Sequence, residues 1–276
     1  MTRLWRSLLA LALLAGCSAT RLAYDHADLL LRWRAERYLD VHGAQSDELD
    51  ARVAAFLAWH RAHALPLYAR FAREAESRLA RELSRADLVW SYDSLHTHIR
   101  AAMRAAAEES APLLDRLGPE QIEHVQQRFA DDNRKFAKEQ LEGDDGERRK
   151  RRVKRNVERL EEWLGGLSDA QVERVRQYSE RAPLVGAMRD RERRRLQAEF
   201  LAMLRAREAG KRLADWAEHW ERHREAAFVA AHRANRDALF DLLLDLDRML
   251  TPAQRESAQA RLREFAVDFE RLAGRK

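Results

Sequence analysis

The sequence has one cysteine and little glycine or proline. Its 276 residues include 1 Cys, 10 Gly and 5 Pro, whereas β-sandwiches and glycine-rich nucleotide-binding loops need many more turn-forming residues. A single thiol also excludes a disulfide framework, a redox pair and a multi-cysteine metal centre within the chain. We therefore expect neither a β-sandwich nor a Rossmann or P-loop domain.

Helix-forming residues dominate what is present. Apolar residues make up 46% of the chain and charged residues 35%, so the chain can build a core and is not expected to be disordered. Alanine, leucine, arginine and glutamate are strong helix formers, and we find no alternating pattern typical of strands. We predict an all-α fold, an elongated bundle or cradle of about eight or nine helices.

Arginine supplies most of the positive charge. Lys+Arg is 51 against 46 for Asp+Glu, which gives a formal net charge of +5, and only six of the 51 are lysine. Guanidinium groups pair well with carboxylates and phosphates. The excess therefore favours anionic partners, although it does not choose among them.

The first seventeen residues have the pattern of an export signal. Two arginines are followed by an apolar run over residues 7–14, which is too short to span a bilayer as a mature helix. The next residues resemble the lipobox of bacterial lipoproteins: Leu14, Ala15, Gly16 and Cys17. The resemblance implies cleavage before Cys17 and acylation of that cysteine. The alternatives are an ordinary secretory signal and a buried N-terminal helix.

The lipobox resemblance sets the expected domain organisation. We expect a signal peptide over residues 1–16, a lipidated tether over 17–23 and an all-helical periplasmic domain over 24–276. Ser18 follows the cysteine where an aspartate would imply retention in the inner membrane. The resemblance thus implies an outer-membrane lipoprotein that faces the periplasm, with the membrane as one partner and nucleic acid as none.

Helical periodicity and capping residues predict the element boundaries. Ser84 is expected to cap one helix, and Pro66 is expected to kink another after residue 61. The clearest loop is at residues 143–146. The expected helices cover residues 24–40, 46 onward through the kink, 85–114, 119 onward, 147–164, 168–182, 184–208, 211–249 and 252 to near the end.

A five-residue pattern occurs three times, each time between an apolar helix end and an amphipathic helix. Its serine or threonine can cap the next helix while the glutamine three positions later completes a capping box. Proline at the first helical position suits a helix start, because no N–H is needed there. The motif residues are Leu117 and Gln121, then Leu167, Ser168 and Gln171, then Leu250, Thr251 and Gln254.

These segments resemble the LTxxQ motif of the Spy/CpxP group of periplasmic proteins. Only residues 250–254 match it fully, since Ser168 and Gly118 stand in place of the threonine. The resemblance implies a helical cradle that acts as an ATP-independent chaperone or a stress-signalling modulator. The alternative is that the shared pattern reflects helix capping alone, which recurs in all-helical chains.

Further segments resemble a group of proteobacterial lipoproteins of unknown function. The matching segments, in chain order after the lipid cysteine, are residues 19–24 (ATRLAY), 31–33 (LRW), 59–61 (WHR) and 65–68 (LPLY). This resemblance supports the lipoprotein prediction and implies no activity.

The sequence contains little that indicates catalysis. His219 and His223 are four residues apart in an expected helix, a spacing that suits a metal. The zinc-protease patterns need a glutamate directly after the first histidine or directly before the second, and Trp220 and Arg222 occupy these positions. No G-x-S-x-G, Ser-x-x-Lys or glycine-rich phosphate loop is present. We therefore expect no enzyme, no catalytic or metal-binding residue and no cofactor.

The strongest candidate binding feature is a basic run of seven cations in eight residues. It lies in the first turns of an expected helix, where the macrodipole disfavours positive charge. It therefore suggests binding of anionic lipids or of unfolded or envelope proteins, and the alternative is a solvated helix face. The candidate residues are Arg148, Arg149, Lys150, Arg151, Arg152, Lys154 and Arg155.

Two non-catalytic functions remain open from the sequence. The first is a chaperone-like or envelope-stress cradle that holds clients by arginine charge and apolar patches. The second is a structural or adaptor lipoprotein in an envelope assembly. The cradle hypothesis expects a concave face lined by basic and apolar side chains, whereas a closed bundle would count against it.

Overall fold

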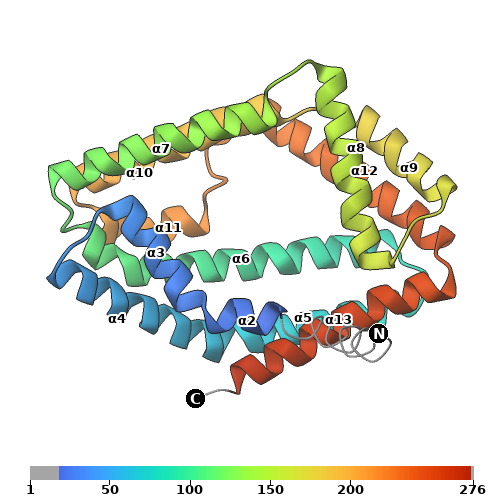
Figure 1. The fold of residues 1–276 in the computed structure, drawn as a ribbon, viewed down its shortest axis with the longest axis horizontal. Helices are drawn as coiled ribbons and strands as arrows, with labels where there is room; N and C mark the ends of the chain where they lie inside the picture. Colours follow the sequence, from blue (N-terminus) through green and yellow to red (C-terminus); the bar gives the residue numbers. More distant parts are fainter. Residues whose placement is uncertain (1–18, 275–276) are drawn as a thin grey trace, which may run out of the picture.

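The computed structural model describes residues 19–274, and every element in that range is helical (Figure 1). The predicted all-α class is confirmed. The lipobox residues Leu14, Ala15, Gly16 and Cys17 lie outside the described residues. The helices are α2 Ala19–Asp25, α3 Ala27–Leu39, α4 Ala44–Trp59, η1 His60–Ala64, α5 Leu65–Leu79, α6 Arg85–Leu114, α7 Pro119–Gln140, α8 Asp145–Leu164, α9 Asp169–Arg181, α10 Gly186–Ala206, α11 Ala209–Glu218, α12 Ala226–Met249 and α13 Pro252–Ala273.

The described helices outnumber the eight or nine expected, because particular residues interrupt helices that were expected to be continuous. The kink expected at Pro66 is present as the π-helix η1, where the Leu65 N–H bonds to the His60 carbonyl five residues back. Proline has no N–H to continue the α-helical ladder, and a π-turn accommodates the change. Helix α2 also begins earlier than expected, so residues 19–23 of the expected tether are helical, and Arg21 pairs with Asp268 of α13 at 3.1 Å.

The single helix expected over residues 211–249 is wrong. The structure has α11 and α12 separated by a turn at residues 219–225, where His223 has a φ of 68°. Arg224 in this turn reaches Glu192 of α10 with a distance of 3.0 Å between Nε and Oε1. Both side chains are largely buried, and this tertiary ion pair outweighs the local helix propensity.

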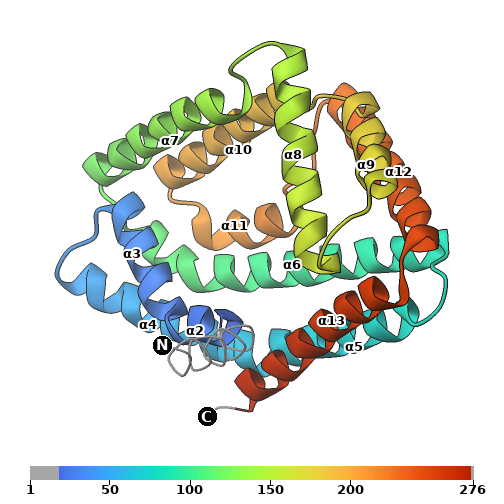
Figure 2. The ribbon, with the colours of Figure 1, turned by 45° about the vertical axis from the view of Figure 1, so that its right-hand side comes forward.

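The helices follow the perimeter of a frame (Figures 1 and 2). Helices α7 and α10 form one side and α5 and α13 the opposite side, while α8, α9 and α12 close one end. No helix among residues 19–274 is long and apolar enough to cross a membrane.

The two ends of the frame are packed unequally. One core cluster of fifteen buried residues joins α4, α6, α7, α10 and α11, and Met203 and Leu204 at its centre are 0% and 1% exposed. At the other end the buried cluster consists of Val175, Leu242 and Leu246 alone. The end formed by α8, α9 and α12 is therefore the one with little core.

Candidate functional site

The repeated motifs lie at the starts of three helices. The hydroxyl oxygens of Ser168 and Thr251 accept hydrogen bonds from the backbone N–H of Gln171 and Gln254. Each glutamine side chain in turn accepts from the backbone N–H of its own capping residue. At α7 the capping residue is Gly118, so only the second bond is present, from the Gly118 N–H to Gln121 Oε1 at 2.9 Å.

Two of the motif glutamines also pair with each other. Gln171 Nε2 donates to Gln254 Oε1 at 3.0 Å, and Gln254 Nε2 donates to Gln171 Oε1 at 2.9 Å. Each Nε2 also bonds to a backbone carbonyl beside the partner motif, that of Met249 and that of Gly166. The two motifs therefore form one junction that joins the starts of α9 and α13, and Gln171 within it is 1% exposed.

Gln121 has a similar partner that the sequence analysis missed. Its Nε2 donates to Gln45 Oε1 at 2.8 Å and to the Asp40 carbonyl at 3.0 Å. Gln45 belongs to the segment Val41–Gln45, whose buried valine stands where the other copies have leucine. A search for any apolar residue four positions before glutamine would have found this fourth copy.

Four arginines of the basic run bind the carboxyl ends of two other helices. Arg148 and Arg151 donate to backbone carbonyls just after α7, those of Leu141 and Glu142. Helix C-termini carry unsatisfied carbonyls and partial negative charge, so cations are favourable there.

The same interaction is made at the end of α9. Arg152 donates to the carbonyls of Ser179, Ala182 and Pro183, and Arg149 donates to those of Glu180 and Ala182. The basic run therefore stabilises the ends of α7 and α9. The sequence alone suggested only anion binding or a solvated helix face.

The remaining cations of the run point elsewhere. Lys150 and Lys154 are exposed, and Lys154 lies 3.8 Å from Glu158 of the same helix. Arg155 and, one turn further along α8, Arg159 line a cavity. Within residues 19–274 neither of these two guanidinium groups has an ion-pair partner.

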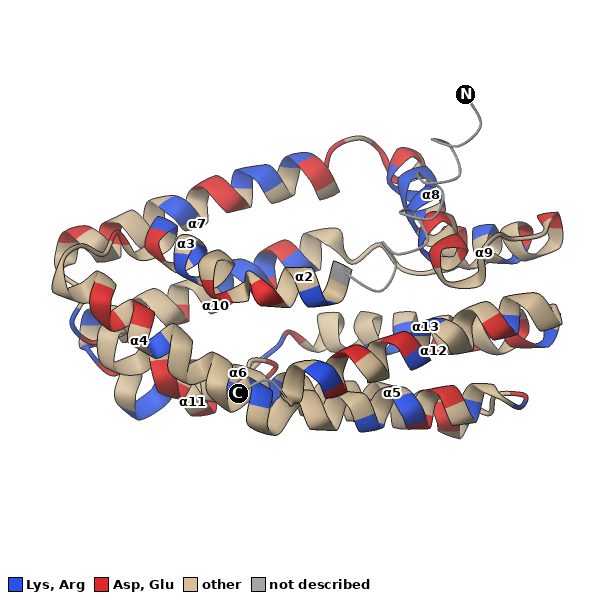
Figure 3. Cartoon of the chain, turned by 60° about the horizontal axis from the view of Figure 1, so that its bottom comes forward, with Lys and Arg blue, Asp and Glu red and all other residues tan. Residues whose placement is uncertain are grey.

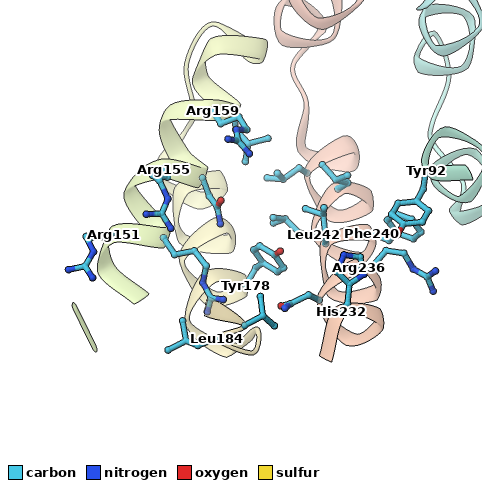
Figure 4. Close-up of a pocket in the computed structure, with 18 of the residues that line it drawn as sticks. Tyr92, Arg151, Arg155, Arg159, Tyr178, Leu184, His232, Arg236, Phe240 and Leu242 are labelled. Atoms are coloured by element: carbon cyan, nitrogen blue, oxygen red, sulfur yellow. The ribbon is translucent and has the colours of Figure 1, made fainter. Parts of the chain in front are cut away.

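The cavity occupies the weakly packed end of the frame and has a volume of about 1020 Å³. Its walls come mainly from α8 and α12, whereas α9 contributes Tyr178 alone. Figure 4 shows Arg155 and Arg159 on α8 across from Leu242 on α12. Apolar side chains from α12 and α8 form much of the lining: Leu239, Phe240, Leu242, Leu243, Leu246, Leu160 and Leu164.

Positive charge exceeds negative charge around this cavity. The lining arginines are Arg148, Arg151, Arg152, Arg155, Arg159, Arg189 and Arg236. The lining carboxylates already have basic partners, namely Glu139 with Lys135, Asp145 with Arg148, and Asp247 with Arg255. The cavity thus has a largely apolar lining and, on α8, two solvent-exposed guanidinium groups, Arg155 and Arg159, that have no carboxylate partner within residues 19–274.

The local pKa shifts agree with a cationic environment. Burial lowers the pKa of the Arg152 guanidinium, and the nearby positive charges of Arg149 and Arg155 lower it further. Burial also lowers the pKa of His232 on the α12 wall, and the Arg224 guanidinium adds to that effect. A bound anion would offset these unfavourable interactions.

The histidine pair singled out in the sequence does not share a helix. His219 ends α11, where its Nδ1 lies 3.1 Å from Asp215 Oδ1, and His223 lies in the following turn. The helical spacing that would suit a metal is therefore lost. Within residues 19–274 no group of three or more metal-ligating side chains occurs.

Comparison with known proteins gives a family. A family model described as a family of unknown function (DUF6279) matches residues 37–222, about two thirds of the chain. The search of curated proteins found no match, and neither did the search of solved structures. The matched segment includes all of the basic helix α8 and the whole of the core cluster around Met203. The chain belongs to this family of unknown function.

Proposed function

We propose that the protein is a lipid-anchored, periplasm-facing lipoprotein of the outer membrane that acts by binding rather than by catalysis. Its body holds an amphiphilic client with a negatively charged head group in the cavity between α8 and α12. The observation that carries this proposal is the combination of a leucine-rich lining with unpaired guanidinium groups of Arg155 and Arg159.

Both parts of the lining favour an amphiphile. An apolar chain that covers the leucines would remove their surface from water, which is the main favourable term in such binding. An anionic head would meet Arg155 and Arg159, which have no carboxylate partner to displace. Charge-assisted bonds from arginine to carboxylate or phosphate are among the stronger hydrogen bonds in proteins.

The cavity volume favours a small client. Small-molecule sites have volumes of about 300–1,000 Å³, and the volume of about 1020 Å³ is just above that range. A stable protein partner would need about 800 Å² of surface on each side. We therefore favour an anionic lipid or fatty acid over an unfolded polypeptide as the client.

The anchor and the placement rest on the sequence. The four residues that end at Cys17 match the lipobox, and Ser18 favours the outer membrane. The paired LTxxQ-like motifs support a likeness to the Spy/CpxP group, and a chaperone-like role in holding clients would agree with it.

Ligand binding by residues 18–276 tests the proposal. We expect lysophosphatidylglycerol and oleate to bind in a 1:1 ratio by calorimetry, more tightly at low salt, because salt screens the guanidinium groups. The double variant Arg155→Gln/Arg159→Gln should weaken binding by about tenfold, which corresponds to about 1.4 kcal/mol.

The matched control lies on the same helix. Lys150→Gln/Lys154→Gln removes two exposed charges that do not line the cavity, so it should leave the affinity unchanged. Equal losses in the two double variants, or no binding at all, would contradict the proposal. Suppression of protein aggregation without lipid binding would assign polypeptide clients instead, and one stable partner in a crosslinking pull-down would assign an adaptor role.

A further inference from the structure

Exposed apolar side chains concentrate on the two helices nearest the lipobox. Of the eleven large hydrophobic residues that are exposed within residues 19–274, five lie on α2 and α3. Four of these five are also the most exposed of the eleven: Leu22 57%, Leu29 55%, Leu30 57% and Trp33 57%. Helix α3 contributes no fully buried residue of its own.

Three of these side chains lie toward one side of α3. Trp33 is three residues after Leu30 and four after Leu29, the spacings that make residues neighbours on a helix surface. The guanidinium of Arg37, one turn later, lies over the Trp33 ring at 5.5 Å. The opposite side of α3 contacts the protein, since Ala35 and Leu39 pack against the main core.

This outward face has the composition of a helix that lies in a membrane interface. Tryptophan and leucine favour the boundary between head groups and acyl chains, and arginine can extend its charged end toward the head groups. Four large apolar side chains that are each more than half exposed lie within two short consecutive helices, whereas exposed apolar residues on a soluble surface are normally scattered singly.

The position of these helices in the chain indicates that a membrane covers their exposed apolar side chains. Helix α2 begins at Ala19, two residues after Cys17. A chain extends at most about 3.6 Å per residue, so an acylated Cys17 would keep α2 within about 7 Å of its own acyl attachment point. Figure 3 shows α2, α3 and the basic helix α8 toward the same side of the molecule.

We propose that the exposed apolar side chains of α2 and α3, namely Leu22, Leu29, Leu30 and Trp33, lie in the membrane leaflet that holds the acyl chains of Cys17. The inference rests on the proposed lipid anchor and adds a second contact to it. The helix pair would then fix the orientation of the body on the membrane.

The test uses the acylated mature protein in vesicles of phosphatidylethanolamine and phosphatidylglycerol. Because Cys17 is the only cysteine and its thiol is acylated, a cysteine introduced by Leu30→Cys can be labelled alone with an environment-sensitive fluorophore. We expect blue-shifted emission and strong quenching by nitroxide-labelled lipids. The control is Leu95→Cys on α6, which is 45% exposed and should be quenched severalfold less.

The measurements distinguish the proposed membrane contact of α2 and α3 from the proposed acyl anchor. Intact mass and vesicle flotation report the acyl anchor, whereas quenching at position 30 reports the surface contact. Protein that floats but shows equal quenching at positions 30 and 95 would overturn the inference and leave the anchor standing. Emission at position 30 that responds to protein density and not to the quencher would also overturn it and would assign the face to a second copy of the chain.

Discussion

The motif glutamine uses both ends of its amide. In Gln171 the Oε1 accepts from the Ser168 N–H within its own capping box, while the Nε2 donates to Gln254 and to the Met249 carbonyl across the junction. Glutamate offers the acceptor without the donor, and asparagine is one methylene shorter. The chemistry of the junction therefore explains why the fifth motif position is glutamine.

The variant Gln171→Glu tests the pairing with Gln254 separately from the capping of α9. The variant keeps the acceptor for Ser168 but loses the donor and buries a carboxylate at a site that is 1% exposed, so we expect the unfolding free energy at pH 7 to fall by about 2–4 kcal/mol. Burial raises the pKa of that carboxyl above its unfolded value. The folded state then binds the proton more tightly, so part of the lost stability should return as the pH falls.

Urea unfolding at pH 7.5 and pH 5 measures this effect. The control is Gln126→Glu, an exposed glutamine whose Oε1 accepts from Arg205 and which a carboxylate can replace. A loss at Gln171 no larger than that at Gln126, or one that grows on acidification, would show that the pairing is not what stabilises the junction.

At the scale of helices, the basic run stabilises helix ends other than its own. The first turn of α8 has Asp145 and Glu147, and Asp144 caps it, so acidic groups balance its own macrodipole. The arginines that follow reach the C-terminal carbonyls of α7 and α9. A cluster of positive charge near the start of α8 is unfavourable for that helix alone. It becomes favourable because its arginines bind the C-terminal carbonyls of α7 and α9.

Arg152→Ala should destabilise the fold through the end of α9. Its guanidinium bonds to three backbone carbonyls there, so we expect a loss of about 1–3 kcal/mol in the free energy of unfolding. Arg155→Ala, one turn away and without such bonds, should cost less than about 0.5 kcal/mol. Denaturant unfolding followed by circular dichroism compares the two, and equal losses would contradict the capping role.

The sequence predicts local features better than tertiary ones. Ser84, Ser168 and Thr251 predicted helix starts because a capping side chain acts within three residues of itself. The turn at residues 219–225 was missed because it depends on Arg224 reaching Glu192 on another helix. For the same reason the basic run could be found in the sequence, but the leucines that face it across the cavity could not.

At the scale of the whole molecule, paired glutamines join distant segments at both ends, yet only one end has a large core. Gln45 and Gln121 join α4 to α7 beside the fifteen-residue cluster, whereas Gln171 and Gln254 join α9 to α13 beside the cavity. The second junction holds walls that have little buried apolar surface between them. We therefore expect the cavity end to open locally while the end with the large core stays folded.

Hydrogen exchange should reveal this difference in the absence of ligand. Helices α9 and α11 are both short, but α11 contributes Leu213 and Ala217 to the large core. Helix α9 contributes only Val175 to the small cluster and lines the cavity with Tyr178. Local opening needs less free energy where few apolar contacts are lost, so we expect amides of α9 to exchange at least about tenfold faster than those of α11. Saturating lysophosphatidylglycerol should slow exchange in α8, α9 and α12 and leave α11 unchanged, because bound chain would replace the missing core. Equal exchange rates in α9 and α11, or ligand protection spread evenly over the chain, would contradict this prediction. Either result would mean that the whole frame unfolds as one cooperative unit.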